Sequence, residues 1–205
     1  MSAEVRHPGP DGPRLAFSFP RRAAVGYDSG MTLPTRAATA GLFLALAAGV
    51  AAAQPDSVEV SPAGGRFKVR FPARPKETTQ KAKTPIGELA VYTATFATPE
   101  GNVLLVGHTD YPPNAANPED HATLLAGARD GLVGKDGKLV AYSPIALGPD
   151  NVPGREVVVD KGKTQLRFRV YLKDNRLYQA GAVGAGAFVT GKYATDFLDS
   201  FELVK

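Results

Sequence analysis

The chain has 205 residues and carries 24 lysines and arginines against 20 aspartates and glutamates, which gives a formal net charge of +4 at pH 7. These charges are scattered in mixed sign rather than gathered in a basic patch, which argues against a nucleic-acid binder. The chain has no cysteine, and this excludes disulfides, thiolate catalysis and cysteine metal sites. Stability must therefore come from an apolar core, which a domain of about 150 residues is large enough to form.

Residues 31–53 are predicted to be a cleaved signal peptide. They combine one positive charge, an apolar run and the small residues Ala51 and Ala53 in the spacing that signal peptidase accepts. A membrane anchor is the alternative, but a span needs about 20 strongly apolar residues, and this run is short and rich in alanine. We therefore expect an exported protein, periplasmic or secreted, with no stable membrane span after cleavage.

Residues 1–30 precede this signal and show no periodic pattern, so we expect no fixed structure there. A start of translation at Met31 would explain why they lie upstream of a signal peptide. A twin-arginine export signal at Arg21-Arg22 is the alternative, although the pair lies far from the apolar run. Residues 54–205 are then expected to form a single domain.

The first half of this domain is predicted to form short strands, because apolar residues recur at every second position. The predicted strands are 57–60, 66–71, 87–98 and 103–111. Residues 76–85 are polar and contain several lysines, and we expect a loop there. Residues 117–132 change to helical spacing, with Asn117 as a cap and Pro118 in the first turn, so they predict a helix.

The second half is predicted to contain further strands at 138–147, 155–160 and 166–183, separated by turns that contain glycine. Residues 184–189 are expected to form a loop and residues 190–200 a second, shorter helix. A short edge strand at 201–204 is expected to close the sheet. This order of elements predicts an α+β fold, in which an antiparallel sheet of about seven or eight strands packs with two α-helices.

The stretch 164–183 specifies this fold most sharply, because apolar and polar residues alternate along it. The apolar positions are Leu166, Phe168, Val170 and Leu172, and the positions between them are Arg167, Arg169, Tyr171 and Lys173. Asp174 and Asn175 predict a two-residue turn, since both tolerate a left-handed backbone. The predicted pairs are Lys173 with Arg176, Leu172 with Leu177 and Tyr171 with Tyr178. We expect the apolar side to face the helices and the polar side to face outward.

Several motifs in residues 54–205 resemble those of small exported domains of the Mog1/PsbP-like class. They are Phe67-x-Val69-x-Phe71-Pro72-x-x-Pro75, Thr109-Asp110-Tyr111-Pro112, Asn175-Arg176-Leu177-Tyr178-Gln179 and Phe197-Leu198-Asp199-Ser200-Phe201. The resemblance covers nearly all of the domain and implies the same α+β fold. The class includes a photosystem oxygen-evolution subunit and a Ran-binding nuclear protein, so it implies a protein that acts by binding other macromolecules. No site residue carries over from either member.

Four charged residues are the candidate binding residues: Arg155 and Glu156 at the entrance to one predicted strand, and Arg167 and Arg169 on the polar side of the next. A patch of mixed charge can recognise a protein partner or a small anion. The alternative interpretation is an exposed cross-strand ion pair, which would contribute about 0.2–1 kcal/mol to stability.

Three residues are the candidate metal ligands: His108, Asp110 and His121. Imidazole and carboxylate groups bind zinc and similar ions. His108 and Asp110 share one face of a predicted strand, and His121 lies near the start of the predicted helix, so a strand-to-helix crossover could bring all three together. In the competing interpretation, Asp110 caps a turn and both histidines are exposed.

The sequence therefore predicts an exported, non-enzymatic accessory domain without a cofactor. We expect it to engage a protein or envelope partner through a sheet face that the helices leave uncovered. A metal-assisted hydrolase that uses the three candidate ligands is the first alternative. A small amphiphile carrier is the second, and it would require a large cavity lined by leucine and phenylalanine.

Overall fold

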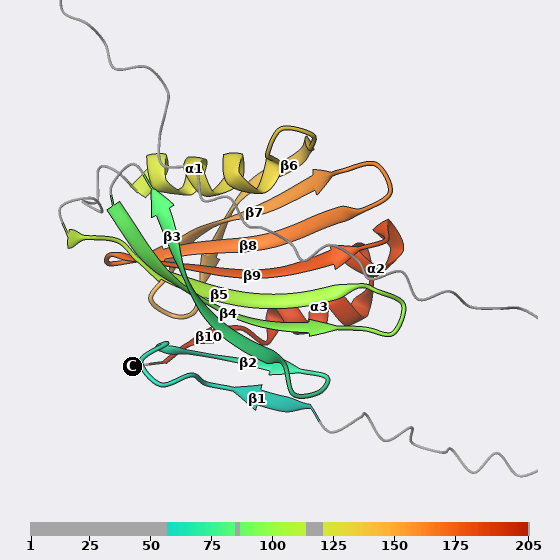
Figure 1. Ribbon diagram of the computed structural model, residues 1–205, viewed down its shortest axis with the longest axis horizontal. Coiled ribbons are helices and arrows are strands. Elements are labelled where there is room, and N and C mark those ends of the chain that lie inside the picture. Colours follow the sequence, from blue (N-terminus) through green and yellow to red (C-terminus); the bar gives the residue numbers. More distant parts are fainter. Residues whose placement is uncertain (1–56, 85–86, 114–120, 205) are drawn as a thin grey trace, which may run out of the picture. The chain divides into compact units, whose positions relative to one another are not determined.

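The computed structural model describes residues 57–84, 87–113 and 121–204 (Figure 1). In chain order the elements are β1 (Val58–Val60), β2 (Phe67–Phe71), β3 (Lys76–Thr84), β4 (Gly87–Ala97), β5 (Val103–Asp110), α1 (His121–Val133), β6 (Lys138–Leu147), β7 (Val152–Asp160), β8 (Gln165–Lys173), β9 (Arg176–Gly184), α2 (Gly186–Thr190), α3 (Lys192–Asp199) and β10 (Glu202–Leu203). Within these ranges, no helix combines the length and the apolar character needed to cross a membrane. The predicted signal peptide and residues 1–30 lie outside the described residues.

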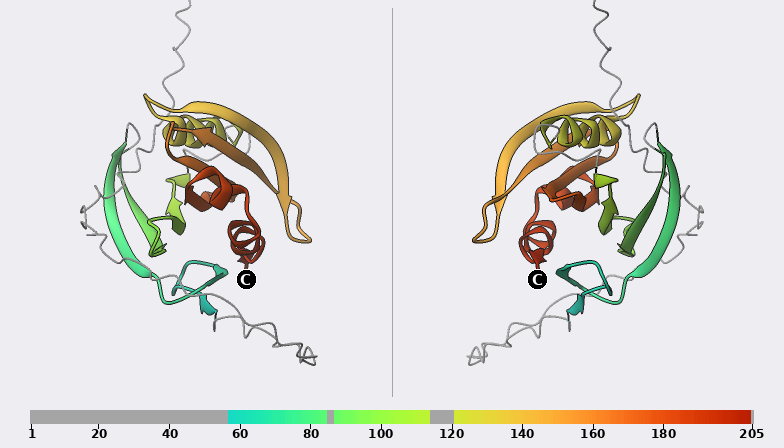
Figure 2. Two further views of the ribbon diagram at one scale, coloured as in Figure 1. Left: turned by 90° about the vertical axis from the view of Figure 1, so that its right-hand side faces the viewer. Right: turned by 90° about the vertical axis from the view of Figure 1, so that its left-hand side faces the viewer.

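The strands form two antiparallel sheets, so the predicted α+β class is confirmed. The larger sheet has seven strands in the order β3-β4-β5-β9-β8-β7-β6. It is curved, with β3 and β6 at its two edges (Figure 2). The smaller sheet has three strands in the order β1-β2-β10. The C-terminal strand therefore pairs with β2 rather than closing the large sheet.

The central hairpin of β8 and β9 is confirmed in each predicted pair, including Lys173 with Arg176 and Tyr171 with Tyr178. Asp174 takes the left-handed backbone that the turn requires, with φ at 54°. The four apolar side chains of β8 are each 1% exposed, and they belong to the same core as the leucines of α1. The two turn residues therefore predicted the turn correctly, and the alternation predicted the buried side of β8.

The opposite side of the central strands is also covered by other elements. The prediction that this polar side faces outward and stays uncovered was therefore wrong. Tyr171 and Tyr178 are each 2% exposed and pack in a second core with residues of β2 and α3. Burying a tyrosine ring is favourable as long as its hydroxyl keeps a polar neighbour. Ala180 and Ala182 of β9 lie on the same side and leave room for the covering elements. The tyrosines between the apolar residues of these strands therefore do not indicate an exposed face of the sheet.

Three local predictions need correction. Residues 76–84 form β3 rather than a loop, because each of its residues pairs with one of β4. Residues 186–190 form the short helix α2, and α3 begins only at Lys192, so there are two short helices where one was expected. The first long helix is confirmed from His121 onward, whereas residues 117–120 lie outside the described residues. It ends at Val133 and is followed by Gly134, whose φ of 60° favours glycine.

Two buried aromatic rings lie directly over glycines of the neighbouring strand, one on each side of the sheet. Phe168 is paired with Gly181, where an added Cβ would lie 2.6 Å from the ring atom Cδ1. Tyr171 is paired with Gly154, where an added Cβ would lie 2.9 Å from Cε1. A side chain at either glycine would have to displace a buried ring, so the two pairs restrict how the sheet can pack.

Candidate functional site

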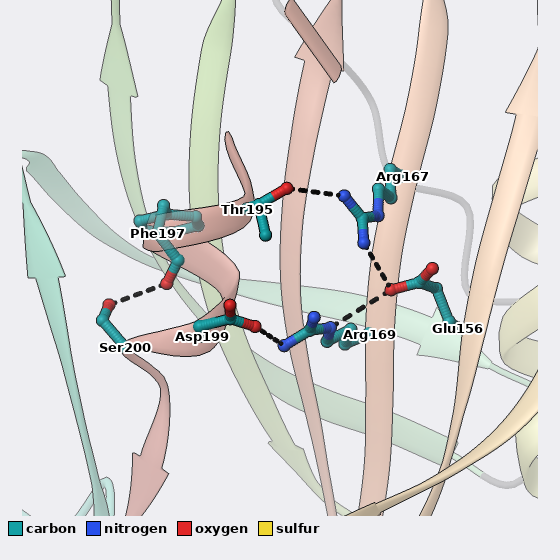
Figure 3. Close-up of polar contacts among 7 residues, drawn as sticks. All are labelled: Glu156, Arg167, Arg169, Thr195, Phe197, Asp199 and Ser200. Atoms are coloured by element: carbon teal, nitrogen blue, oxygen red, sulfur yellow. Dashed lines mark hydrogen bonds and ion pairs between the residues drawn. The ribbon is translucent and has the colours of Figure 1, made fainter. Parts of the chain in front are cut away.

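A charged network joins α3 to the large sheet on the side of the second core (Figure 3). Glu156 of β7 accepts hydrogen bonds from Arg167 at 3.1 Å and from Arg169 at 3.2 Å, both through its atom Oε2. Each arginine also contacts α3 through another nitrogen of its guanidinium group. Arg167 donates to the Thr195 hydroxyl at 3.0 Å, and Arg169 pairs with Asp199 at 2.7 Å. Five side chains from β7, β8 and α3 are therefore linked in one chain of contacts.

The strand register explains why the sequence brings these groups together. Glu156 is directly opposite Arg169, and Arg167 lies two residues before Arg169 on the same strand, so all three side chains point to one side. They are only partly exposed, at 24% for Glu156, 19% for Arg169 and 17% for Arg167. Three of the four predicted binding residues are thus neighbours.

The charges of this network are matched within it, with two guanidinium groups against two carboxylates. Burial alone would lower the pKa of Arg169, but hydrogen bonds to Asp199 and Glu156 raise it above its ordinary value. Each guanidinium and each carboxylate of the network therefore already has a partner of opposite charge. Because these charges balance one another, the network is best suited to fixing α3 on the sheet.

Ser200 continues the attachment of α3 at the end of the helix. Its hydroxyl donates to the Phe197 carbonyl at 2.7 Å (Figure 3) and accepts the backbone N–H of Arg70 at 3.0 Å. Arg70 belongs to β2, so the serine joins the helix to the smaller sheet. With both bonds made and only 5% of the residue exposed, this hydroxyl serves packing.

Arg155, the fourth predicted binding residue, lies on the opposite side of the sheet. Successive residues of a strand point to opposite faces, so Arg155 and Glu156 cannot share one. The Arg155 guanidinium lies 5.7 Å from the ring centre of Tyr142 on β6, and Arg129 of α1 lies 5.0 Å from the same ring. The prediction of a single patch of four charged residues was therefore wrong.

The three predicted metal ligands are not brought together. His108 lies among aromatic rings of the second core, with ring centres 5.1 Å from Tyr92 and 5.9 Å from Phe67. Asp110 pairs with Arg176, Oδ1 to Nε, at 2.5 Å. His121 begins α1, which packs on the other side of the sheet. The described part of the chain contains no group of three or more histidine, cysteine or carboxylate side chains arranged to hold a metal ion.

His108 has an unusual environment for a titratable side chain. Its Nδ1 is buried and has no hydrogen-bond partner. The pKa of His108 is lowered below its ordinary value of 6.5, mainly by burial and secondly by the positive charge of Arg176. The negative charge of Asp110 has a smaller, opposite effect. The imidazole is therefore neutral at neutral pH, and protonation would place a charge beside the Tyr92 and Phe67 rings.

The lowered pKa of His108 predicts that the free energy of unfolding decreases as pH falls below 6.5. Below this pH, His108 takes up a proton more readily in the unfolded chain than in the folded protein. The stability that comes from the neutral imidazole is therefore complete above the pKa of His108 in the unfolded chain, and it is lost as pH falls to the pKa of His108 in the folded protein. Urea unfolding at a series of pH values measures the effect. The variant His108→Phe keeps a ring but cannot titrate, so its stability should depend less on pH in this range. Equal slopes for both proteins would contradict the prediction.

The sequence patterns did not identify two hollows on the surface of the described residues. One of about 290 Å³ lies beside β1 and is lined in part by Glu59, Arg74 and Glu77. The other, of about 380 Å³, is lined in part by the aromatic rings of Phe96 and Tyr193. Neither is lined by a leucine, and the phenylalanines of the second hollow, Phe96 and Phe188, lie at the edge of the second core rather than around an enclosed cavity, so neither hollow has the lining expected of an amphiphile carrier.

Comparison with known proteins gives no family for this chain. No protein-family model matches it, and no curated protein does. A solved structure that resembles it is that of PA94, a Pseudomonas aeruginosa protein of unknown function, with 11% sequence identity and a TM-score of 0.31. The match covers 64% of this chain and 84% of that one. A likeness this low carries no argument, so the Mog1/PsbP-like resemblance stays a prediction.

Proposed function

We propose that this chain is an exported, non-enzymatic accessory protein that binds a protein or envelope partner through the outer strand β6 of its large sheet. The observation that carries the proposal is the exposure of apolar side chains on this edge. Val140 is 58% and Leu139 39% exposed, and they are two of the three large hydrophobic residues exposed in the described part of the chain. They are consecutive residues at the β-bulge of this edge strand, and exposed large apolar side chains favour contact with a partner.

The two edges of the large sheet differ in charge, and the difference favours β6 over β3. The β3 edge carries Lys76, Glu77, Lys81 and Lys83, and charged side chains discourage an edge from pairing with another chain. The ten residues of β6 include a single charged one, Lys138. A β-bulge beside Val140 and a proline at position 144 interrupt the backbone edge of β6, so the proposed contact is made by its side chains rather than by an added strand.

The side of β6 that faces α3 adds to this surface. Ser143 is exposed there, and Ile145 and Leu147 are partly exposed beside the second core. The charged network of Glu156 fixes α3 next to these strands and keeps its own charges paired. In this proposal the network positions the surface, and the β6 residues make the contact.

The proposal is tested by placing the same charge on each edge of the sheet. Val140→Glu changes β6, and Thr79→Glu changes an exposed position of β3 as the matched control. The full chain carrying either change is produced in the source cells, and its partners are identified by crosslinking and mass spectrometry. We expect one partner to be recovered with the unmodified chain and with Thr79→Glu, and to be lost with Val140→Glu. Equal recovery with all three, or recovery of none, would refute the proposal.

A further inference from the structure

Three aromatic side chains from separate elements meet in the larger surface hollow, which we term the aromatic groove. Phe96 comes from the end of β4, Phe188 from α2 and Tyr193 from the first turn of α3. They line the groove of about 380 Å³ together with the turn residues Thr98, Pro99 and Glu100. The Phe188 and Tyr193 rings lie 5.8 Å apart with their planes inclined at 52°, so the two rings form angled walls.

The three rings are partly open to solvent. Tyr193 is 45% exposed, the third of the large exposed hydrophobic residues in the described part of the chain. Phe96 and Phe188 are partly exposed, and their buried portions pack against the second core. The core therefore holds the rings of Phe96 and Phe188 in place and leaves part of each open to a ligand.

One carboxylate stands at the rim of the groove. Glu100 is exposed and takes part in none of the ion pairs found among the described residues. A hydrogen bond from Thr98 lowers the pKa of Glu100, so the group is ionised at neutral pH. Glu100 and Tyr193 line the same groove, and the pKa of Tyr193 is raised, first by partial burial and then by the charge of Glu100.

Aromatic faces with a carboxylate at their edge select a particular kind of ligand. The face of an aromatic ring attracts a cation, and a quaternary ammonium group can enter such a site because it carries its charge under a shell of methyl groups. A metal ion such as calcium would need six or more oxygen ligands, which these rings do not offer. The carboxylate would repel an anion.

We propose that the aromatic groove binds the quaternary ammonium group of a small solute such as choline. The ammonium group would lie against the rings of Phe96, Phe188 and Tyr193, with Glu100 supplying the opposite charge. The groove is formed by other residues than the β6 edge, so this inference does not depend on the proposed partner.

The test compares choline with 3,3-dimethylbutan-1-ol, a neutral molecule of nearly the same shape. Each is titrated into the full chain, and the NMR signals of the aromatic rings are followed. We expect choline to shift the signals of the three groove rings and the neutral molecule to bind at least about tenfold more weakly, a difference of about 1.4 kcal/mol. Equal affinity for the two would overturn the proposal, because the groove would then be recognising shape alone.

Two variants locate the binding, and both change exposed residues. Tyr193→Leu keeps apolar volume but removes the ring face, and Glu100→Gln removes the charge, so each is expected to weaken choline binding by about tenfold or more. Glu88→Gln, which changes an exposed carboxylate on β4 that does not line the groove, is the control and should leave binding unchanged. Choline binding that survives both groove variants would overturn the proposal. Binding to phosphatidylcholine vesicles without binding of free choline would also overturn it, in favour of a membrane surface.

Discussion

Replacing Phe168 by alanine is expected to lower the free energy of unfolding by about 3–5 kcal/mol. The side chain is 1% exposed and lies in the core that α1 shares with the central strands. Removing the ring takes away buried apolar surface and leaves a cavity over Gly181, whose lack of a side chain provides nothing to fill it. Urea unfolding of the variant and of the unmodified protein measures the difference.

The control for this prediction is Thr79→Ala, an exposed position at the β3 edge. Substitutions of this kind usually change stability by no more than about 0.5 kcal/mol. If the two variants unfolded at the same urea concentration, the side of β8 that carries Phe168 would not be the buried one.

The sequence predicted best where neighbouring residues alone determine the structure. The β8–β9 hairpin depends on alternation over about ten residues and on two turn residues that accept a left-handed backbone, and its register is confirmed. The polar strand β3 was missed because its own residues do not alternate clearly between apolar and polar. It is a strand because β4 offers it a complete partner, which is information carried by another part of the chain.

The same distinction explains the result for the candidate sites. Glu156 and Arg169 could be placed together because cross-strand pairing follows from the hairpin and the strand beside it. The sequence alone also shows that Arg155 cannot belong to the same patch, since it is the immediate neighbour of Glu156 on the strand and must point to the other face of the sheet. The aromatic groove could not be predicted, because Phe96 and Tyr193 are brought together only when α3 packs on the sheet.

Introducing valine at Gly181 is expected to destabilise the protein by about 1–3 kcal/mol. Valine normally suits a strand better than glycine, so a stabilising effect would be expected from local preference alone. Here the added Cβ would lie 2.6 Å from Cδ1 of the Phe168 ring and closer still to Cε1, and that ring is enclosed by the core and cannot move aside freely. Packing against the ring, rather than local strand preference, therefore determines that the change in the free energy of unfolding is a loss. Unfolding in urea measures this change.

Combining Gly181→Val with Phe168→Ala separates this packing effect from any general damage to the strand. Once the ring is removed, the new valine can occupy part of the vacated space. We therefore expect the double variant to be more stable than the sum of the two single changes predicts, by about 0.5–3 kcal/mol. The four proteins of this cycle are compared by urea unfolding under one set of conditions. Strictly additive losses would mean that the ring does not lie over Gly181, and the pairing of β8 with β9 in one tightly packed layer would need revision.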